Sequence, residues 1–425
     1  MLTARIEGPE PVVLPNAGGG TPRLSTWGGF YATYRDVRGR AIRYRRAGGS
    51  GWTLDPDGSQ DWTIHEYWEW YQSAQRMAAM PNVAYYLTNI PLKDVDLRAW
   101  RAANAEVDAL CMGGALDLMR YIRLWNEDAP VPPMKALGYL APPWLIGTYP
   151  HFDGAGSQVS VHTYAFGPGW QLVHVYPELS AFQEQLFLET CGLKDRSVLP
   201  HSWATTLDCS LECWDTVLQA RLAVQGIVPV ATVRLMAGQT IVLPARRAHA
   251  FKKCVENVAE TWRTDGLMFS VAGDASFVGA TQACFVRELS CLLLAERTAA
   301  VAKEGAYSMC ELALLSLVRE GPLLRDDVVA AEHLKGVGYF FKCFIEEQCL
   351  WARKAKEVKS LEAASEILLE RACCQCKRSL ANVMLVQEGG SQVWCGNCCP
   401  ARASLVAQTR FYTLAELEEM FANLK

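Results

Sequence analysis

The apolar positions between about residues 140 and 275 come in short runs separated by glycine and proline. Short apolar or alternating runs between turn-forming residues are typical of β-strands. The pattern therefore predicts an all-β region, with strands that include residues 159–166, 171–176, 228–235 and 240–243.

The pattern differs on both sides of this region. The pattern predicts a helix over residues 62–80 and a short aromatic strand over Ala84–Leu87. An arginine-rich stretch over residues 30–47 predicts a hairpin that turns at Gly39. From about 280 to 370 apolar pairs such as Phe340-Phe341 recur at helical spacing. Near the end, Thr413 and Glu416 have the spacing of a capping box at the start of a helix.

The chain of 425 residues is long enough for roughly two or three domains. We expect one large mixed α/β protein without internal repeats. Its expected segments are a loose leader rich in proline and glycine, an N-terminal helical and β decoration, the β-rich core, a helical region, and a small cysteine-rich module with a terminal helix: 1–28, 29–140, 141–275, 276–370 and 371–425.

Composition narrows the class of protein. Half of the residues are hydrophobic, which excludes wholesale disorder, and the formal net charge of -4 excludes nucleic-acid binding through an overall positive field. No apolar run reaches the roughly twenty residues that a bilayer crossing needs. The first residues lack the apolar run of a secretory signal, so we expect a nuclear or cytoplasmic protein that is not secreted.

Six of the sixteen cysteines cluster near the C-terminus, in Cys373-Cys374-Gln375-Cys376 and Cys395-Gly396-Asn397-Cys398-Cys399. Two Cys-x-x-Cys pairs separated by the eighteen residues 377–394 have the spacing of a structural four-cysteine zinc site. We assign Cys373, Cys376, Cys395 and Cys398 as ligands, with Cys374 and Cys399 as alternates. A disulfide or simple packing of the thiols stays open as an alternative.

A second metal site is suggested by His151-Phe152-Asp153. Residues i and i+2 of a strand share a face, so this segment can offer an imidazole and a carboxylate to one ion. His249, which follows a predicted strand and Pro244, could complete a face of two histidines and one carboxylate, the ligand set of Fe(II) oxygenases. Taken alone, the dyad could equally be a loop histidine beside a turn aspartate.

The surroundings of these residues resemble the JmjC family of Fe(II)/2-oxoglutarate oxygenases over about residues 60–275. Thr148 stands three residues before the first histidine, two predicted strands follow the dyad, and Gly238–His249 fits the pattern Gly-x-Thr, three apolar residues, Pro, four residues and His. The resemblance is closest to the chromatin lysine demethylases. It implies a double-stranded β-helix (cupin-like jelly-roll) core, iron bound by His151, Asp153 and His249, 2-oxoglutarate as co-substrate, and demethylation of N-methyl-lysine in a histone or another chromatin protein.

The chain departs from the family at one position. The family usually supplies a lysine after the glycine of the turn between those two strands, as the partner of the distal carboxylate of 2-oxoglutarate, but this turn reads Gly167-Pro168-Gly169-Trp170. A buried carboxylate needs a cation, which Arg247, Arg246 or Lys252 could supply. We expect Thr148, His162 and Tyr164 to help bind the co-substrate, although ordinary cross-strand packing is an alternative for the last two.

Two further functions stay open. Six arginines between Arg35 and Arg46, interleaved with tyrosines, could contact nucleic acid, or they could form a solvated hairpin face. The same oxygenase chemistry could then act on a nucleobase or a non-histone side chain. Alternatively, the missing lysine favours a chromatin adaptor that keeps the fold and the zinc module but has lost catalysis.

Overall fold

The computed structural model describes residues 10–15, 20–46, 52–77, 81–108, 136–143, 147–151, 159–190, 219–244, 247–256, 266–275, 345–360, 373–375, 380, 382–387, 392–400, 404–409 and 412–423. The chain divides into two compact units. We call them the β-rich unit (Met1–Met112 and Met134–Ala275) and the cysteine unit (Gly113–Pro133 and Ser276–Lys425), and describe each by itself.

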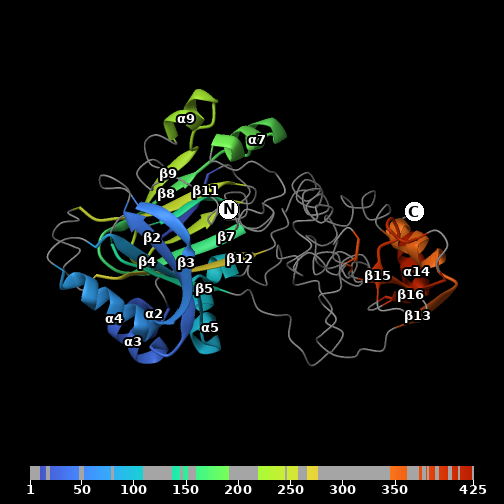
Figure 1. Ribbon diagram of the computed structural model, residues 1–425, viewed down its shortest axis with the longest axis horizontal. Helices are drawn as coiled ribbons and strands as arrows, with labels where there is room; N and C mark the ends of the chain where they lie inside the picture. Colours follow the sequence, from blue (N-terminus) through green and yellow to red (C-terminus); the bar gives the residue numbers. More distant parts are fainter. Residues whose placement is uncertain are drawn as a thin grey trace. The chain divides into compact units, whose positions relative to one another are not determined.

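Two antiparallel sheets form the β-rich unit (Figure 1). The large sheet has eight strands in the order β1-β10-β7-β12-β5-β4-β2-β3, and the small sheet has four in the order β6-β11-β8-β9. The strands are β1 (Val12–Leu14), β2 (Arg38–Arg46), β3 (Trp52–Thr63), β4 (Val83–Pro91), β5 (Leu137–Ala141), β6 (Gly147–His151), β7 (Val159–Phe166), β8 (Trp170–Val175), β9 (Ala231–Met236), β10 (Thr240–Leu243), β11 (His249–Cys254) and β12 (Met268–Ala275).

One apolar core joins the two sheets. Its buried side chains come from three strands of the large sheet and from three strands of the small sheet: Tyr164, Ile241, Leu243, Met268, Val173, Val175, Leu235 and Phe251. Each sheet therefore turns one face toward the other, in an arrangement compatible with a β-sandwich. The strands predicted over 140–275 are found, with β7 and β10 at the predicted bounds and β9 beginning three residues later than predicted, at Ala231. The region is not all-β, however, because two helices also lie within it, at Ala181–Thr190 and Gln219–Val224.

Helices cover the ends of the β-rich unit, with α2, α3 and α4 gathered at one end (Figure 1). They are α2 (Pro22–Ser25), α3 (Trp27–Tyr34), α4 (Ile64–Gln75), α5 (Asp94–Ala103), α6 (Ala105–Asp108), α7 (Ala181–Thr190) and α9 (Gln219–Val224). The predicted helix over 62–80 is α4, which begins with a reciprocal capping box between Thr63 and Glu66. None of the helices that the structure describes is both long and apolar enough to cross a membrane.

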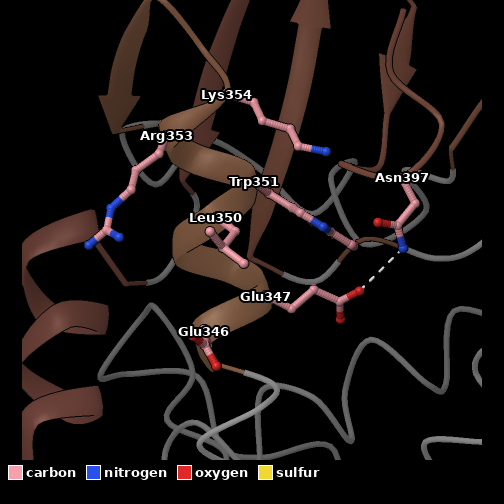
Figure 2. Close-up of a pocket in the computed structure, with 7 residues that line it drawn as sticks. All are labelled: Glu346, Glu347, Leu350, Trp351, Arg353, Lys354 and Asn397. Atoms are coloured by element: carbon pink, nitrogen blue, oxygen red, sulfur yellow. Dashed lines mark hydrogen bonds between the residues drawn. The ribbon is translucent and has the colours of Figure 1, made fainter. Parts of the chain in front are cut away.

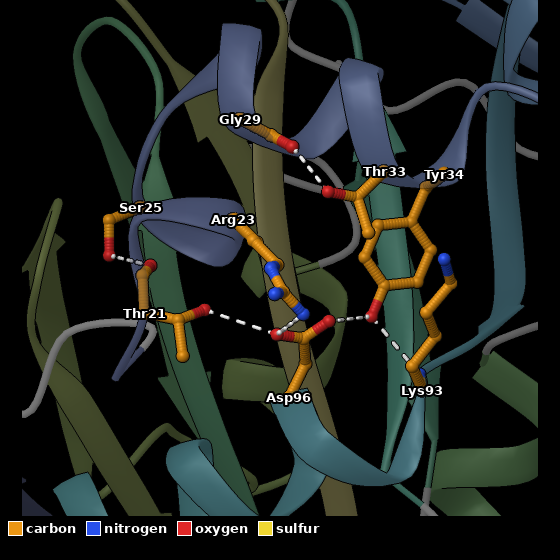
Figure 3. Close-up of polar contacts among 8 residues, drawn as sticks. All are labelled: Thr21, Arg23, Ser25, Gly29, Thr33, Tyr34, Lys93 and Asp96. Carbon is orange, nitrogen blue, oxygen red and sulfur yellow. Dashed lines mark hydrogen bonds and ion pairs between the residues drawn. The ribbon is translucent and has the colours of Figure 1, made fainter.

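The prediction of a loose leader is wrong for the described part of residues 1–28. Val12–Leu14 pair with β10, and Pro22 occupies the first turn of α2, where proline is tolerated because that N–H needs no helical partner. The segment is fixed around the fully buried carboxylate of Asp96 (Figure 3). Its Oδ2 accepts a hydrogen bond of 2.7 Å from Tyr34, and its Oδ1 lies 3.4 Å from the Thr21 hydroxyl and 3.7 Å from the Arg23 guanidinium.

The predicted turn at Gly39 is also wrong. Gly39 lies inside β2, which pairs with β3 on one side and β4 on the other. A Cβ at this position would approach the carbonyl oxygen of Thr88 to 2.8 Å, so the glycine permits close approach of two strands rather than a turn. The arginine-rich hairpin is instead formed by β2 and β3.

The cysteine unit contains a small sheet in the order β13-β16-β14-β15. Its elements are a helix over residues 345–353, β13 (Glu357–Ser360), β14 (Val383–Gln387), β15 (Val393–Trp394), β16 (Leu405–Thr409) and α14 (Leu414–Asn423). The predicted capping box is confirmed at α14, where Thr413 N–H donates to Glu416 over 2.8 Å and Glu416 N–H donates to the Thr413 hydroxyl over 3.3 Å. The helical region predicted over 276–370 includes one described helix, but it also includes the strand β13; residues 276–344 and 361–370 lie outside the described residues.

Candidate functional site

Two of the predicted iron ligands stand opposite each other on neighbouring strands. In the antiparallel pair of β6 and β11, His249 is the partner of His151, and Phe251 is the partner of Thr148. The register shifts between His249 and Phe251, and such bulges often re-aim a side chain beside an active site. The third predicted ligand, Asp153, lies outside the described residues.

The His249 ring is buried and held in one orientation. Its Nδ1 lies 3.1 Å from the backbone oxygen of Arg247. A carbonyl oxygen only accepts hydrogen bonds, so Nδ1 carries the proton and the lone pair of the neutral ring is on Nε2. Metal-binding histidines are commonly fixed by such a contact of the other ring nitrogen. The backbone of Arg247 thus contacts the ring, and the predicted role of its side chain stays a prediction.

A buried polar cluster lies between the sheets next to His249. His162 Nε2 is 2.8 Å from Gln171 Oε1, and the amide nitrogen of Gln171 donates to the hydroxyl of Ser270. Phe251 connects this cluster to His249, since its ring stacks on His162 with centroids 4.1 Å apart and meets His249 edge-on at 5.6 Å. Sequence reasoning pointed to His162 but missed Gln171 and Ser270, because a lone glutamine or serine in an apolar strand carries no motif.

The two predicted hydroxyl groups have different surroundings. Tyr164 is fully buried in the apolar core, its hydroxyl donates to the carbonyl oxygen of Pro168 over 2.8 Å, and burial raises its pKa well above the usual value. These contacts fit the packing alternative for Tyr164. Thr148 instead hydrogen-bonds the phenol of Tyr86, which belongs to β4 of the large sheet.

The Tyr86 hydroxyl, which Thr148 contacts, also has Lys253 as a partner. Its side chain is fully buried, its Nζ lies 3.3 Å from the Tyr86 hydroxyl and 4.6 Å from the centroid of that ring, and burial lowers its pKa to about 7. Strand alternation could have found it, because residues two apart share a face and Phe251 lies in the core. Lys252, the lysine predicted from the sequence, lies next to Lys253 on β11, so its side chain points to the opposite face of the sheet.

In the cysteine unit, the sulfur atoms of Cys373, Cys395 and Cys398 lie within 4.8 Å of one another, so they could hold a metal ion. Burial raises the pKa of Cys395 well above its usual value, and the hydrogen bond that its thiol makes with Cys398 raises it further. A bound cation would reverse this preference for the thiol by stabilising the thiolate. Cys376, the predicted fourth ligand, lies outside the described residues.

The turn that carries Cys395 and Cys398 is held by the helix over residues 345–353 and the residue after it (Figure 2). Lys354 Nζ donates to the Gly396 carbonyl over 2.5 Å, and Asn397 donates to Glu347 over 3.3 Å. Gly396 lies against the Trp351 ring so closely that a Cβ would come within 1.9 Å of it. Glu347, Trp351 and Lys354 of this segment and Asn397 of the turn also line a hollow of about 460 Å³.

The arginines of β2 are largely engaged with acidic residues of β3. Arg43 and Arg45 both bind the carboxylate of Asp55, and Arg40 lies 3.2 Å from Asp61. Paired guanidinium groups present less positive charge to a phosphate backbone, so this arrangement favours a solvated hairpin face over a nucleic-acid surface.

No protein-family model matches the chain, and a search of curated proteins finds no match either. The resemblance to JmjC oxygenases therefore rests on the residues of this sequence.

Proposed function

We propose that the β-rich unit is an Fe(II)- and 2-oxoglutarate-dependent oxygenase of the JmjC type. The observation that carries the proposal is the register of β6 and β11, which sets His151 opposite His249 although the two residues are far apart in the sequence. Directly opposed residues of an antiparallel pair have Cβ atoms about 4.5–5.5 Å apart. Two imidazoles at such positions can bind one ion.

The strand pairing supports the finer fold assignment, a double-stranded β-helix. β5 pairs with β12, β6 with β11, β7 with β10, and β8 with β9, all antiparallel. From β5 to β12 the chain changes sheet at every connection except the one from β8 to β9. Such nested pairing is expected of a jelly roll, in which one long hairpin is rolled into two sheets, and it therefore supports this assignment.

The donor set fits iron. His249 offers Nε2, His151 stands opposite, and Asp153 would add the carboxylate of a two-histidine, one-carboxylate face. When bound, iron and 2-oxoglutarate would supply, together with O2, the oxidising chemistry that hydroxylates a C–H bond: one oxygen atom would enter the substrate and the other would enter succinate as 2-oxoglutarate loses CO2. On an N-methyl-lysine, loss of the hydroxylated methyl group as formaldehyde would leave the demethylated lysine. The protein's own residues orient the substrate and exclude water. By the resemblance, the substrate is a histone or another chromatin protein, and the location is the nucleus.

In the cysteine unit we propose a structural zinc ion bound by Cys373, Cys395, Cys398 and Cys376. The convergence of the first three sulfur atoms supports this assignment. Four thiolates would leave no open coordination position, so the ion would stabilise the fold and take no part in catalysis.

The iron site is tested by metal analysis of anaerobically reconstituted protein, with 2-oxoglutarate turnover followed as succinate. His249→Ala should lose the iron and all succinate formation. His174→Ala is the matched control, since His174 is also buried, lies on the neighbouring strand β8 and hydrogen-bonds Thr232 over 3.1 Å. The control should keep its iron. Equal iron content in wild type and His249→Ala would refute the site.

A second candidate function is supported by one feature of the sequence. A non-catalytic chromatin adaptor is favoured by the turn Gly167–Trp170, which lacks the family's lysine. The same assay separates the two functions, because an adaptor would form no succinate with or without methylated peptides. The nucleobase alternative loses support from the pairing of Arg43 and Arg45 with Asp55.

A further inference from the structure

Lys253 is a basic side chain buried in the interior of the β-rich unit, with one hydrogen-bond partner among the residues that the structure describes. Its ammonium group has three donors, but among the described residues it reaches only the Tyr86 hydroxyl, at 3.3 Å, and no carboxylate lies within ion-pair distance. A buried charge without a counter-charge is strongly unfavourable. Apolar residues of similar size would satisfy packing at this position, so the lysine points to a ligand that supplies the missing negative charge.

The groups around Lys253 are those of a polar site. Lys253 lies directly opposite Gln171 on β8, and Gln171 is fully buried and bonded to His162 and Ser270. Tyr86 links the lysine to Thr148 on β6. Hydrogen-bonding groups from both sheets therefore meet in the interior beside an uncompensated cation.

This site and the histidine pair lie on the same strand. Lys253 lies four positions after His249 on β11, which is about 13 Å along an antiparallel strand. An ion on the imidazole, a five-carbon diacid and the lysine side chain can together span this length. Phe251, between them on the strand, contacts both His249 and His162.

We propose that Lys253 binds the distal carboxylate of 2-oxoglutarate, and that it replaces the lysine missing from the Gly167–Trp170 turn. This inference rests on the proposed oxygenase function. It assigns Tyr86 as a positioning residue, which holds the ammonium group through its hydroxyl and its ring. Lys253 would then take the role for which the sequence had suggested Arg247, Arg246 or Lys252.

The test measures binding of 2-oxoglutarate by calorimetry to the anaerobic, iron-loaded full-length protein. Lys253→Met should weaken binding by about 10- to 100-fold, because a charge-assisted hydrogen bond is lost, while iron content stays at the wild-type level. Lys253→Arg should restore part of the affinity. Lys252→Met and Arg247→Ala are the matched controls and should bind 2-oxoglutarate as the wild type does.

Thermal unfolding gives an independent readout. If the lysine is kept for a ligand, Lys253→Met should raise the melting temperature of the ligand-free protein by about 2–10 °C, since it removes an unpaired buried charge. It should also abolish the stabilisation that 2-oxoglutarate gives the wild type. A higher melting temperature shows in addition that the variant folds.

The failures can be told apart. Unchanged affinity in Lys253→Met would overturn the role of Lys253 but leave the oxygenase proposal standing, and a loss confined to Arg247→Ala or Lys252→Met would move the anchor to that residue. A wild-type protein that binds iron but no 2-oxoglutarate would overturn this inference and the proposed co-substrate together. Loss of affinity only where iron is also lost would show a structural effect and count against Lys253.

Discussion

The histidine pair and the cysteine cluster are both candidate metal sites, but they are assembled over very different distances along the chain. Cys395 and Cys398 belong to one turn, in which the Cys398 N–H donates to the Cys395 carbonyl over 3.2 Å. His151 and His249 are brought opposite each other only because β6 and β11, which are far apart in the sequence, pair as neighbours in the small sheet. A local site can be identified from spacing alone, whereas a site between distant strands needs either the fold or a resemblance to a family of known fold.

The same difference predicts how each site depends on its metal. The histidine pair stands in a unit with its own apolar core, built from residues such as Val173, Leu235 and Met268. The cysteine unit has a sheet of four short strands, so a zinc ion would contribute a larger share of its stability. We therefore expect metal loss to unfold the cysteine unit and to leave the β-rich unit folded.

The largest expected effect is that of the double substitution Cys395→Ser and Cys398→Ser. Structural zinc sites contribute about 10–16 kcal/mol of binding energy to folding, so removal of two ligands should abolish zinc binding and unfold the cysteine unit. Metal analysis should fall from about one zinc per chain to none. Circular dichroism should retain the strand signal of the β-rich unit.

The control for this experiment is Cys399→Ser. Cys399 lies on the same turn, but it is outside the sulfur triad and its Sγ contacts the Gly396 carbonyl at 3.3 Å. It should keep its zinc. Zinc content that is unchanged in the double variant, or lost equally in the control, would contradict the ligand assignment.

A second prediction uses the charge of Lys253 to probe the β-rich unit. Its pKa is lowered from 10.5 to about 7 by burial, so between these values the unfolded chain binds a proton that the folded protein does not. The free energy of unfolding should therefore rise with pH from about 7 to 10, by at most about 5 kcal/mol for this group. Burial raises the pKa of Tyr44 and Tyr67, so stability should fall again once tyrosines of the unfolded chain ionise above about pH 10.

Chemical denaturation of wild type and Lys253→Met at several pH values isolates the contribution of the lysine. The difference between the two stabilities should be largest near pH 7 and below, and should vanish toward pH 10.5. A difference that is independent of pH would show that Lys253 is charged in the folded, ligand-free protein or already paired.

Some features of the fold and of the candidate site could be predicted from the sequence, and others could not. Strands such as Val159–Phe166 and the capping box of Thr413 and Glu416 follow from local patterns, and both are found. Gly39 was misread because a glycine in a strand and a glycine in a turn look alike until the neighbouring strand is known. Lys253 was missed for a related reason, since burial by a strand of the other sheet is not encoded near residue 253.

A third, smaller effect is expected at the buried carboxylate that fixes the leader segment. Tyr34→Phe removes the hydroxyl that donates to Asp96 over 2.7 Å and accepts from the Lys93 N–H over 3.0 Å. An unsatisfied buried group destabilises by about 1–3 kcal/mol. Urea denaturation should show this loss, while Ser25→Ala, whose hydroxyl is exposed and bonds only the Thr21 carbonyl, should change stability by less than about 0.5 kcal/mol. Equal stabilities for wild type and Tyr34→Phe would mean that Asp96 does not depend on this contact.

The smallest effect tests the division into two units, through the capping box that each unit contains. Thr63 caps α4 with Glu66 in the β-rich unit, and Thr413 caps α14 with Glu416 in the cysteine unit. Because the chemistry is the same, Thr63→Ala and Thr413→Ala should each destabilise by about 1 kcal/mol. If the units unfold separately, calorimetry should show two transitions, and each substitution should lower the temperature of only one of them. A single transition shifted equally by both substitutions would show that the units unfold together, and the contrast between a metal-dependent and a metal-independent unit would then be wrong.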